Sequence, residues 1–242
     1  MELLAVIAIV TILTALLLPT LGRTQAKARR IQCLANLRQT GIGFHSFLHD
    51  HNDCFPMQVS TNFGGTMESL FASYLAGQDG SSSYSHFQSL SNDLASPRIF
   101  ACPADPARTP ADDFSTLNNK NISYFVGANA DYSLPNSILA GDRNIISAAS
   151  NSSRSLIRLA ESKPASWTRE LHGLKGNQLF ADGHVERVNG LLVKLPRRNA
   201  PVAMDLFLPT VKTPLPPPSA LAGLPRDRWD TIAPETQSQP SL

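Results

Sequence analysis

Residues 2–21 read ELLAVIAIVTILTALLLPTL and determine the first element of the fold. From Leu3 to Leu18 the run contains no charged residue and no glycine, and its only polar side chains are two threonines. Counted through Leu21, the run has about nineteen residues, which is near the minimum for an α-helix that crosses ~30 Å of hydrocarbon. The sequence favours a membrane-spanning helix over a cleaved secretory signal, because no cationic segment precedes the run and no small-residue cleavage site follows it.

A second pattern predicts that this helix continues well beyond the apolar run. Apolar or small residues recur at spacings of three and four at Leu34, Leu37, Gly41, Phe44 and Leu48. Such spacing is typical of a helix that packs one face against another surface. We therefore expect one helix from about Glu2 to about His49, with a kink or local loosening at Pro19.

The composition limits the class of protein and its division into parts. With 21 Lys plus Arg and 19 Asp plus Glu, the net charge of +2 gives no electrostatic case for nucleic-acid binding. Three cysteines are too few for a disulfide scaffold, and ten of the 18 prolines lie in residues 196–242. We divide the 242 residues into four parts: a transmembrane half-helix (1–21), an amphipathic half-helix (22–50), a globular domain (51–194) and a proline-rich tail (195–242). We expect the tail to be extended or disordered and to form no central strand.

The globular segment begins with helical patterns and continues with strands. Thr66 precedes a helical pattern over residues 67–75, and the later strand-like runs are 122–126, 137–140, 156–160, 177–181 and 184–188. Asp182-Gly183 separates the last two runs and favours a two-residue type I′ turn, which would place Phe180 opposite Val185. The predicted fold class is α+β, with a long N-terminal helix packed on a small antiparallel sheet.

The N-terminal segment resembles a known family. Residues 1–10, MELLAVIAIV, and a proline seventeen residues after Glu2 are similar to the start of type IV pilins and type II secretion pseudopilins. The resemblance implies a pilin-like fold and a structural subunit, not an enzyme. It also implies that Glu2 neutralises the terminal ammonium of a neighbouring copy and so sets the assembly register, with Pro19 at the family's proline position.

The same resemblance implies a location and partners. The chain would cross the bacterial inner membrane once and place its globular domain in the periplasm. Its partners would be copies of itself or other pseudopilins, membrane lipid, and prepilin peptidase if the reading frame upstream of Met1 encodes a basic leader ending in glycine. The alternative is a membrane-tethered module that binds a ligand outside the cytoplasm and does not assemble into filaments.

Four internal segments are similar to the pseudopilin-like families of Planctomycetes and Verrucomicrobia. Three are residues 30–39 (RIQCLANLRQ), 100–106 (FACPADP) and 138–144 (ILAGDRN). The fourth is an H-x9-DG pattern formed by His172 and Asp182-Gly183. The resemblance supplies no function for this signature. A turn explains Asp182 and Gly183, and we expect His172 to hydrogen-bond near that turn, since no nucleophile motif accompanies it.

Several other groups of residues have the chemistry to bind an ion or a partner. A polar helix end contains His45, His49, Asp50, His51 and Asp53 without an H-E-x-x-H pattern. We expect no cofactor. Asp131, Asp142 and Asp182 lie in or beside loops, and calcium binding by these carboxylates is left as an alternative. A disulfide between Cys33 and Cys102 is another alternative, which the sequence does not decide because it does not give the distance between the two residues. The basic residues of segment 23–30 favour lipid headgroups over DNA, so no nucleic-acid partner is expected.

Overall fold

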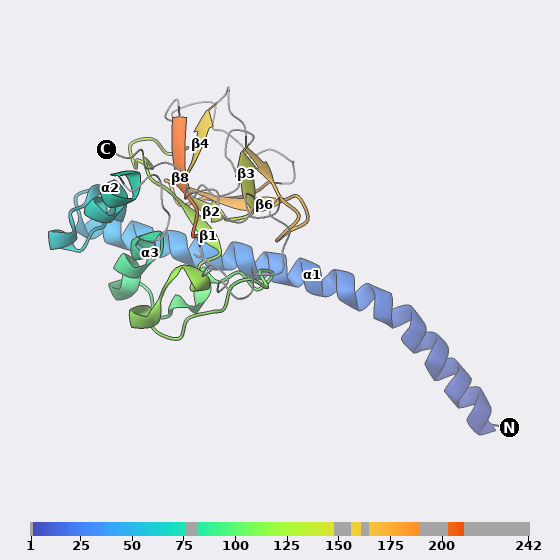
Figure 1. Cartoon of the computed structure of the whole chain (residues 1–242). Coiled ribbons are helices and arrows are strands. Elements are labelled where there is room, and N and C mark those ends of the chain that lie inside the picture. Colours follow the sequence, from blue (N-terminus) through green and yellow to red (C-terminus); the bar gives the residue numbers. More distant parts are fainter. Residues whose placement is uncertain (1, 76–81, 148–155, 161–164, 189–202, 211–242) are drawn as a thin grey trace, which may run out of the picture. The chain divides into compact units, whose positions relative to one another are not determined.

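The computed structural model describes residues 2–75, 82–147, 156–160, 165–188 and 203–210 (Figure 1). Its first element, α1 (Glu2–Asp50), is a single helix of 49 residues, which confirms the predicted continuous helix. The helix continues without interruption through Pro19. Over the described residues, no helix combines the length and the apolar character needed to cross a membrane.

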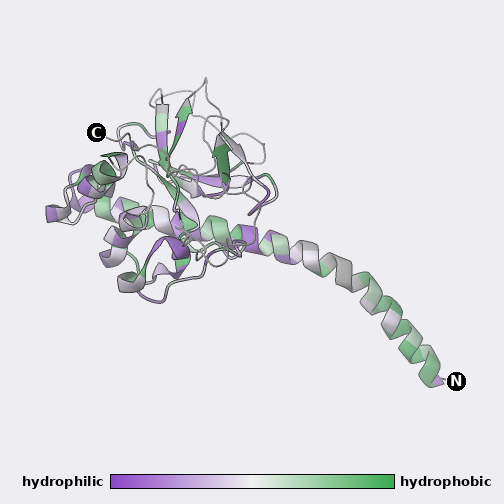
Figure 2. Cartoon of the chain, viewed as in Figure 1, coloured by the Kyte–Doolittle hydropathy of each residue, from purple (hydrophilic) through white to green (hydrophobic). Residues whose placement is uncertain are grey.

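The side chains of α1 change character along its length. The first part carries large apolar side chains that are each more than half exposed: Leu3, Leu4, Val6, Ile7, Ile9, Val10, Ile12, Leu13 and Leu16. Figure 2 shows this hydrophobic part of the helix beyond the part that meets the sheet. The second part buries one face, formed by Cys33, Leu37, Thr40, Gly41, Phe44, Phe47 and Leu48. The predicted stripe is therefore confirmed except at Leu34, which is only half-buried because Cys33 takes the buried position at that turn.

A six-stranded antiparallel sheet forms the centre of the domain, in the order β4-β8-β1-β2-β6-β7. Its strands are β1 (Tyr124–Gly127), β2 (Ile138–Asp142), β4 (Leu156–Ala160), β6 (Gly176–Phe180), β7 (Val185–Val188) and β8 (Ala203–Phe207). A separate pair joins β3 (Ile145–Ser147) to β5 (Ala165–Trp167). The α+β class and the strands expected in the globular segment are confirmed, each strand within two residues of its predicted bounds.

Short helices fill the segment between α1 and the sheet. The α-helices are α2 (Met67–Leu75) and α3 (Ser85–Gln88), and the 3₁₀ helices are η1 (Pro56–Gln58), η2 (Thr61–Phe63), η4 (Ser89–Asn92), η5 (Pro97–Phe100), η6 (Phe114–Thr116) and η7 (Asn119–Asn121). The predicted helix after Thr66 is confirmed by α2. Tyr74 of α2 donates a hydrogen bond of 2.8 Å to Asp205 of β8, which ties this helical segment to the sheet.

Both faces of the sheet are covered by apolar side chains. Tyr124 and Val126 of β1 belong to the core that contains Phe44 of α1, whereas Phe125 between them belongs to a second core with Trp167 of β5. This alternation follows from the two-residue period of a strand. The α1 side of the sheet therefore holds the larger core, and the β3–β5 pair contributes to the core on the other face.

The prediction that the tail forms no central strand is wrong for residues 203–207. These residues form β8, which pairs with β4 on one side and with β1 on the other. Proline disrupts a central strand by removing a backbone donor. Pro201 and Pro209 flank β8 but do not enter it, so the strand keeps its hydrogen-bonding groups. Residues 195–202 and 211–242 of the predicted tail lie outside the described residues.

The predicted two-residue turn between β6 and β7 is also wrong. Leu179 pairs with Val185, which shifts the register by one residue from the expected pairing. The N–H of Phe180 donates to the carbonyl of His184, and the N–H of Gly183 donates to the carbonyl of Phe180. Gly183 has a φ of 86°, whereas Asp182 is not among the residues with positive φ. The loop therefore has three residues and ends in a left-handed glycine.

Candidate functional site

Four buried polar side chains meet beneath the sheet, and we refer to Cys33, Cys102, Asp142 and His172 as the Cys-His cluster. Cys33 lies on the buried face of α1, Cys102 follows η5, Asp142 ends β2, and His172 lies in the turn between β5 and β6. The exposed fraction is 2% for Cys102 and zero for Cys33 and Asp142. The side chain of His172 is also only 2% exposed. Four chain segments that are distant in the sequence thus bring their donor groups together at one buried position.

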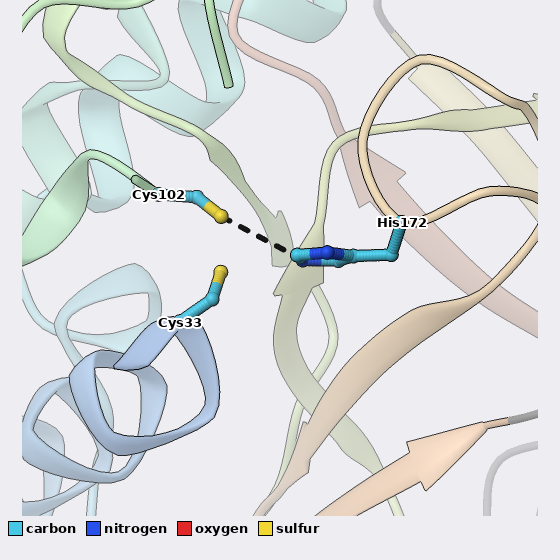
Figure 3. A group of neighbouring side chains, drawn as sticks. All are labelled: Cys33, Cys102 and His172. Atoms are coloured by element: carbon cyan, nitrogen blue, oxygen red, sulfur yellow. Dashed lines mark hydrogen bonds between the residues drawn. The ribbon is translucent and has the colours of Figure 1, made fainter. Parts of the chain in front are cut away.

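The donor atoms of the Cys-His cluster lie close together. The two sulfur atoms and a ring nitrogen of His172 all lie within 4.8 Å of one another. Cys102 Sγ is 3.6 Å from His172 Nε2, and Figure 3 shows the imidazole directed toward the two cysteines. Asp142 completes the group, with Oδ1 at 3.5 Å from Cys33 Sγ and Oδ2 at 3.4 Å from His172 Nε2.

A first set of surrounding polar groups fixes Asp142 and Cys33. The backbone N–H and the side-chain amide of Asn177 in β6 both donate to Asp142 Oδ2, at 2.8 and 3.0 Å. The hydroxyl of Tyr124 lies 3.5 Å from Cys33 Sγ and donates to the carbonyl of Cys33 at 3.3 Å. These contacts orient both side chains toward the cluster.

A second set fixes the two loops that carry Cys102 and His172. The backbone N–H of Cys102 donates to Ser123 Oγ at 2.9 Å, and that hydroxyl donates to Asp105 at 2.8 Å. The guanidinium of Arg143 bridges Asp105 to Glu170, two residues before His172. Arg143 directly follows Asp142, so one arginine connects three of the four segments.

Burial favours the neutral form of the cluster's titratable groups. Desolvation raises the pKa of the Cys33 thiol well above its usual range and raises the pKa of Asp142 to about 7. The same cause, with a smaller contribution from the charge of Arg30, lowers the pKa of His172 to about 4. A divalent cation among these groups would reverse this preference by stabilising thiolate and carboxylate.

The geometry does not suit a catalytic Cys-His-Asp relay. In such a relay the nucleophile and the carboxylate contact opposite ring nitrogens, so that the imidazole passes a proton between its two sides. Here Cys102 and Asp142 both approach Nε2 of His172. The sulfur, the oxygen and the nitrogen are therefore grouped around one point, as the ligands of an ion are.

The structure separates His172 from the rest of its sequence signature. The Nε2 atom of His172 contacts Cys102 and Asp142, whereas the turn is held by other groups. Asp182 there accepts hydrogen bonds from the backbone N–H of His184 at 3.0 Å and from its Nδ1. The predicted structural role of Asp182 and Gly183 in the hairpin is consistent with these contacts. The predicted hydrogen bond of His172 near the turn is not among the contacts of its Nε2 atom, which go to Cys102 and Asp142.

The other ion-binding candidates do not assemble into a comparable group. His51 stacks on the ring of Phe47, and its two nitrogens contact the backbone carbonyls of Phe47 and Phe63. An open pocket of about 510 Å³ is lined by Arg38, Gly41, Ile42, His45, Ser46, His49, Asp50 and Gly183. Asp131, a calcium candidate, accepts from the N–H of Ser133 at 2.8 Å. Among the described residues, the group of three donors found close enough for an ion is Cys33, Cys102 and His172.

Sequence reasoning paired Cys33 with Cys102 but did not connect them to His172 or Asp142. A usable signal was present, because each of the four segments singled out by resemblance supplies one member of the cluster. Residues 30–39 supply Cys33, 100–106 supply Cys102, 138–144 supply Asp142, and the H-x9-DG pattern supplies its histidine. Only the fold shows that these segments converge.

The beginning of α1 is the second candidate site. Glu2 is exposed in the first turn of the helix, and exposed apolar side chains follow it. In comparisons with protein-family models, with curated proteins and with solved structures, nothing matches this chain.

Proposed function

We propose that the chain is a pseudopilin-like structural subunit of a type II secretion or type IV pilus-like assembly. In this proposal residues 2–21 lie in the bacterial inner membrane and pack against other copies, and the sheet domain lies in the periplasm. The observation that carries the proposal is the division of α1 into an exposed apolar part and a part packed into the domain core.

The apolar side chains in the first part of α1 are not covered by the rest of the domain. Leu3, Leu4, Val6 and Ile7 lie on successive positions around the helix and are all more than half exposed. An isolated soluble domain rarely leaves such a continuous apolar surface uncovered. Lipid and the same segment of neighbouring copies have the matching chemistry.

The continuity of α1 favours assembly over simple tethering. A flexible linker is sufficient for a tether, but one helix from Glu2 to Asp50 fixes the apolar part relative to the domain. Copies that pack through their apolar parts would therefore hold their domains in a defined order. Glu2 supports this arrangement, because a carboxylate drawn into an apolar assembly requires a cationic partner.

The substitution Glu2→Ala tests this role. We expect the variant to remain in the membrane fraction, because its apolar run is unchanged, and to lose assembly into filaments or oligomers. Glu2→Asp is the matched control that keeps the charge and should retain part of the assembly. Normal assembly of Glu2→Ala would contradict the proposal and favour the membrane-tethered binding module.

A further inference from the structure

We propose that Cys33, Cys102, His172 and Asp142 bind one Zn²⁺ ion that fastens α1 to the sheet domain. This inference does not depend on the pseudopilin proposal, since it concerns the interior of the domain. Two thiolates, an imidazole and a carboxylate are all established types of zinc ligand, and four protein ligands make a closed structural site.

The distances within the cluster are compatible with a tetrahedral ion. Bond lengths of about 2.3 Å to sulfur and about 2.0 Å to nitrogen or oxygen place neighbouring ligand atoms roughly 3.3 to 3.8 Å apart. The distance from Cys102 Sγ to His172 Nε2, 3.6 Å, and that from Cys33 Sγ to Asp142 Oδ1, 3.5 Å, fall in this range. The contact of 3.4 Å between His172 Nε2 and Asp142 Oδ2 is longer than a normal N–H···O hydrogen bond.

The surroundings of the cluster resemble the outer shell of a metal site. Metal-binding side chains are usually oriented by further hydrogen bonds, which fix the direction of their donor atoms. Asn177 binds Asp142 twice, and Tyr124 lies against Cys33. The Arg143 bridge to Asp105 and Glu170 holds the loops of Cys102 and His172 from outside the cluster.

The charges of the proposed site can be balanced. Binding of Zn²⁺ would displace the protons of both thiols to solvent, and with the Asp142 carboxylate the site would carry one net negative charge. The half-buried guanidinium of Arg30, one helical turn before Cys33, interacts favourably with both Asp142 and Cys33. It supplies a nearby positive charge, so the buried site is not left uncompensated.

A disulfide between Cys33 and Cys102 explains less of the cluster. It would use the two sulfur atoms and leave Nε2 of His172 with the 3.4 Å contact to Asp142 in place of a bond to the ion. The ion uses all four groups and connects four chain segments. Because those groups are buried, the ion would have no open position for substrate, and its role would be structural.

The first experiment measures metal in the full chain, purified in detergent without chelator. Plasma mass spectrometry should find about one zinc per chain, as expected for a closed structural site. After exchange, Co²⁺ should give sulfur-to-cobalt charge transfer and the strong visible bands of tetrahedral coordination. Thiol counting in denaturant with a chelator should find Cys33, Cys54 and Cys102 all reduced. A Cys33–Cys102 disulfide, or three free thiols in a chain that takes up neither Zn²⁺ nor Co²⁺, would overturn the proposal.

Variants then assign the ligands. We expect Cys102→Ser and His172→Gln to weaken Zn²⁺ binding by at least about 100-fold, and Asp142→Asn to alter the visible cobalt bands. Cys54→Ser is the matched control, because Cys54 is the third cysteine and contacts the carbonyl of Asn52 outside the cluster. Circular dichroism shows which variants fold. If Cys102→Ser does not fold, the cobalt spectrum and zinc content of the wild-type chain still decide the proposal. Unchanged zinc content in folded His172→Gln would refute the assignment of His172.

Discussion

The guanidinium of Arg143 holds the carboxylate of Asp105 through two hydrogen bonds of 2.7 and 2.8 Å. The Asp105 side chain is fully buried, and that of Arg143 is only 11% exposed. Burial alone would raise the pKa of Asp105, but the hydrogen bonds and charge of Arg143 lower it below its usual value. The pair therefore stabilises a charged group inside the domain, next to the loop of Cys102.

Removal of the Arg143 guanidinium should lower the free energy of unfolding strongly. Arg143→Met leaves the Asp105 carboxylate buried without its partner, so we expect a loss of about 3 to 5 kcal/mol in the free energy of unfolding. Denaturant unfolding followed by circular dichroism measures this loss. Arg98→Met is the control, because Arg98 and Asp112 form an exposed ion pair worth at most about 1 kcal/mol. Equal effects of the two substitutions would show that the Arg143 pair is not structural.

Gly127 at the end of β1 is a second position at which substitution should destabilise the domain strongly. A Cβ atom at this position would lie 1.9 Å from the backbone carbonyl oxygen of Ile138, which cannot rotate away as a side chain can. We expect Gly127→Ala to lower the free energy of unfolding by about 3 kcal/mol or more, because strands β1 and β2 must separate locally. Gly22→Ala, where nothing lies within 4 Å, should leave unfolding of the domain unchanged. A tolerated Gly127→Ala would mean that β1 and β2 do not pair this closely.

His86 gives the domain a predictable pH dependence. It is buried, its Nδ1 lies 2.7 Å from the hydroxyl of Thr66, and desolvation lowers its pKa to about 4. The unfolded chain, with an ordinary histidine pKa of about 6.5, binds more protons between these two values, so stability is complete above about pH 6.5 and falls as the pH drops toward 4.

The comparison with His86→Gln isolates this effect from the other titrating groups. Between about pH 7.5 and about pH 5, the wild-type chain should lose roughly 2 kcal/mol more than the variant. Denaturant unfolding at the two pH values measures the difference. Parallel losses in the two proteins would show that His86 is not held in its neutral form.

The sequence predicted the elements whose signals are local. The apolar run and the three-four spacing identified α1 to within a residue of its end, and strand-like runs bounded by turn residues identified β1, β2, β4, β6 and β7. Hydrophobic spacing did not resolve Leu34 from Cys33, because a free cysteine packs like a small apolar residue. The Asp182-Gly183 pair located the hairpin, but the same dipeptide occurs in two-residue and three-residue loops, and these differ in register by one.

Features that depend on distant segments were missed. The prolines on both sides of β8 made residues 203–207 look like part of a tail, although pairing with β4 and β1 decides their structure. The Cys-His cluster escaped detection because its four residues come from α1, two loops and the end of β2. Metal-ligand motifs that can be read from sequence have short spacings, and this cluster has none.

Cross-linking of single cysteines along α1 tests the assembly proposal most directly. Cysteines placed one at a time at positions 3 to 16 of full-length protein in membranes, in a Cys54→Ser background, report which positions meet the same position in a neighbouring copy. An ordered assembly predicts disulfide-linked dimers at a subset of positions that repeats with the period of a helix, and their loss when Glu2→Ala is added. Absence of cross-links at every position, or equal cross-linking at all of them, would contradict an ordered assembly through this helix.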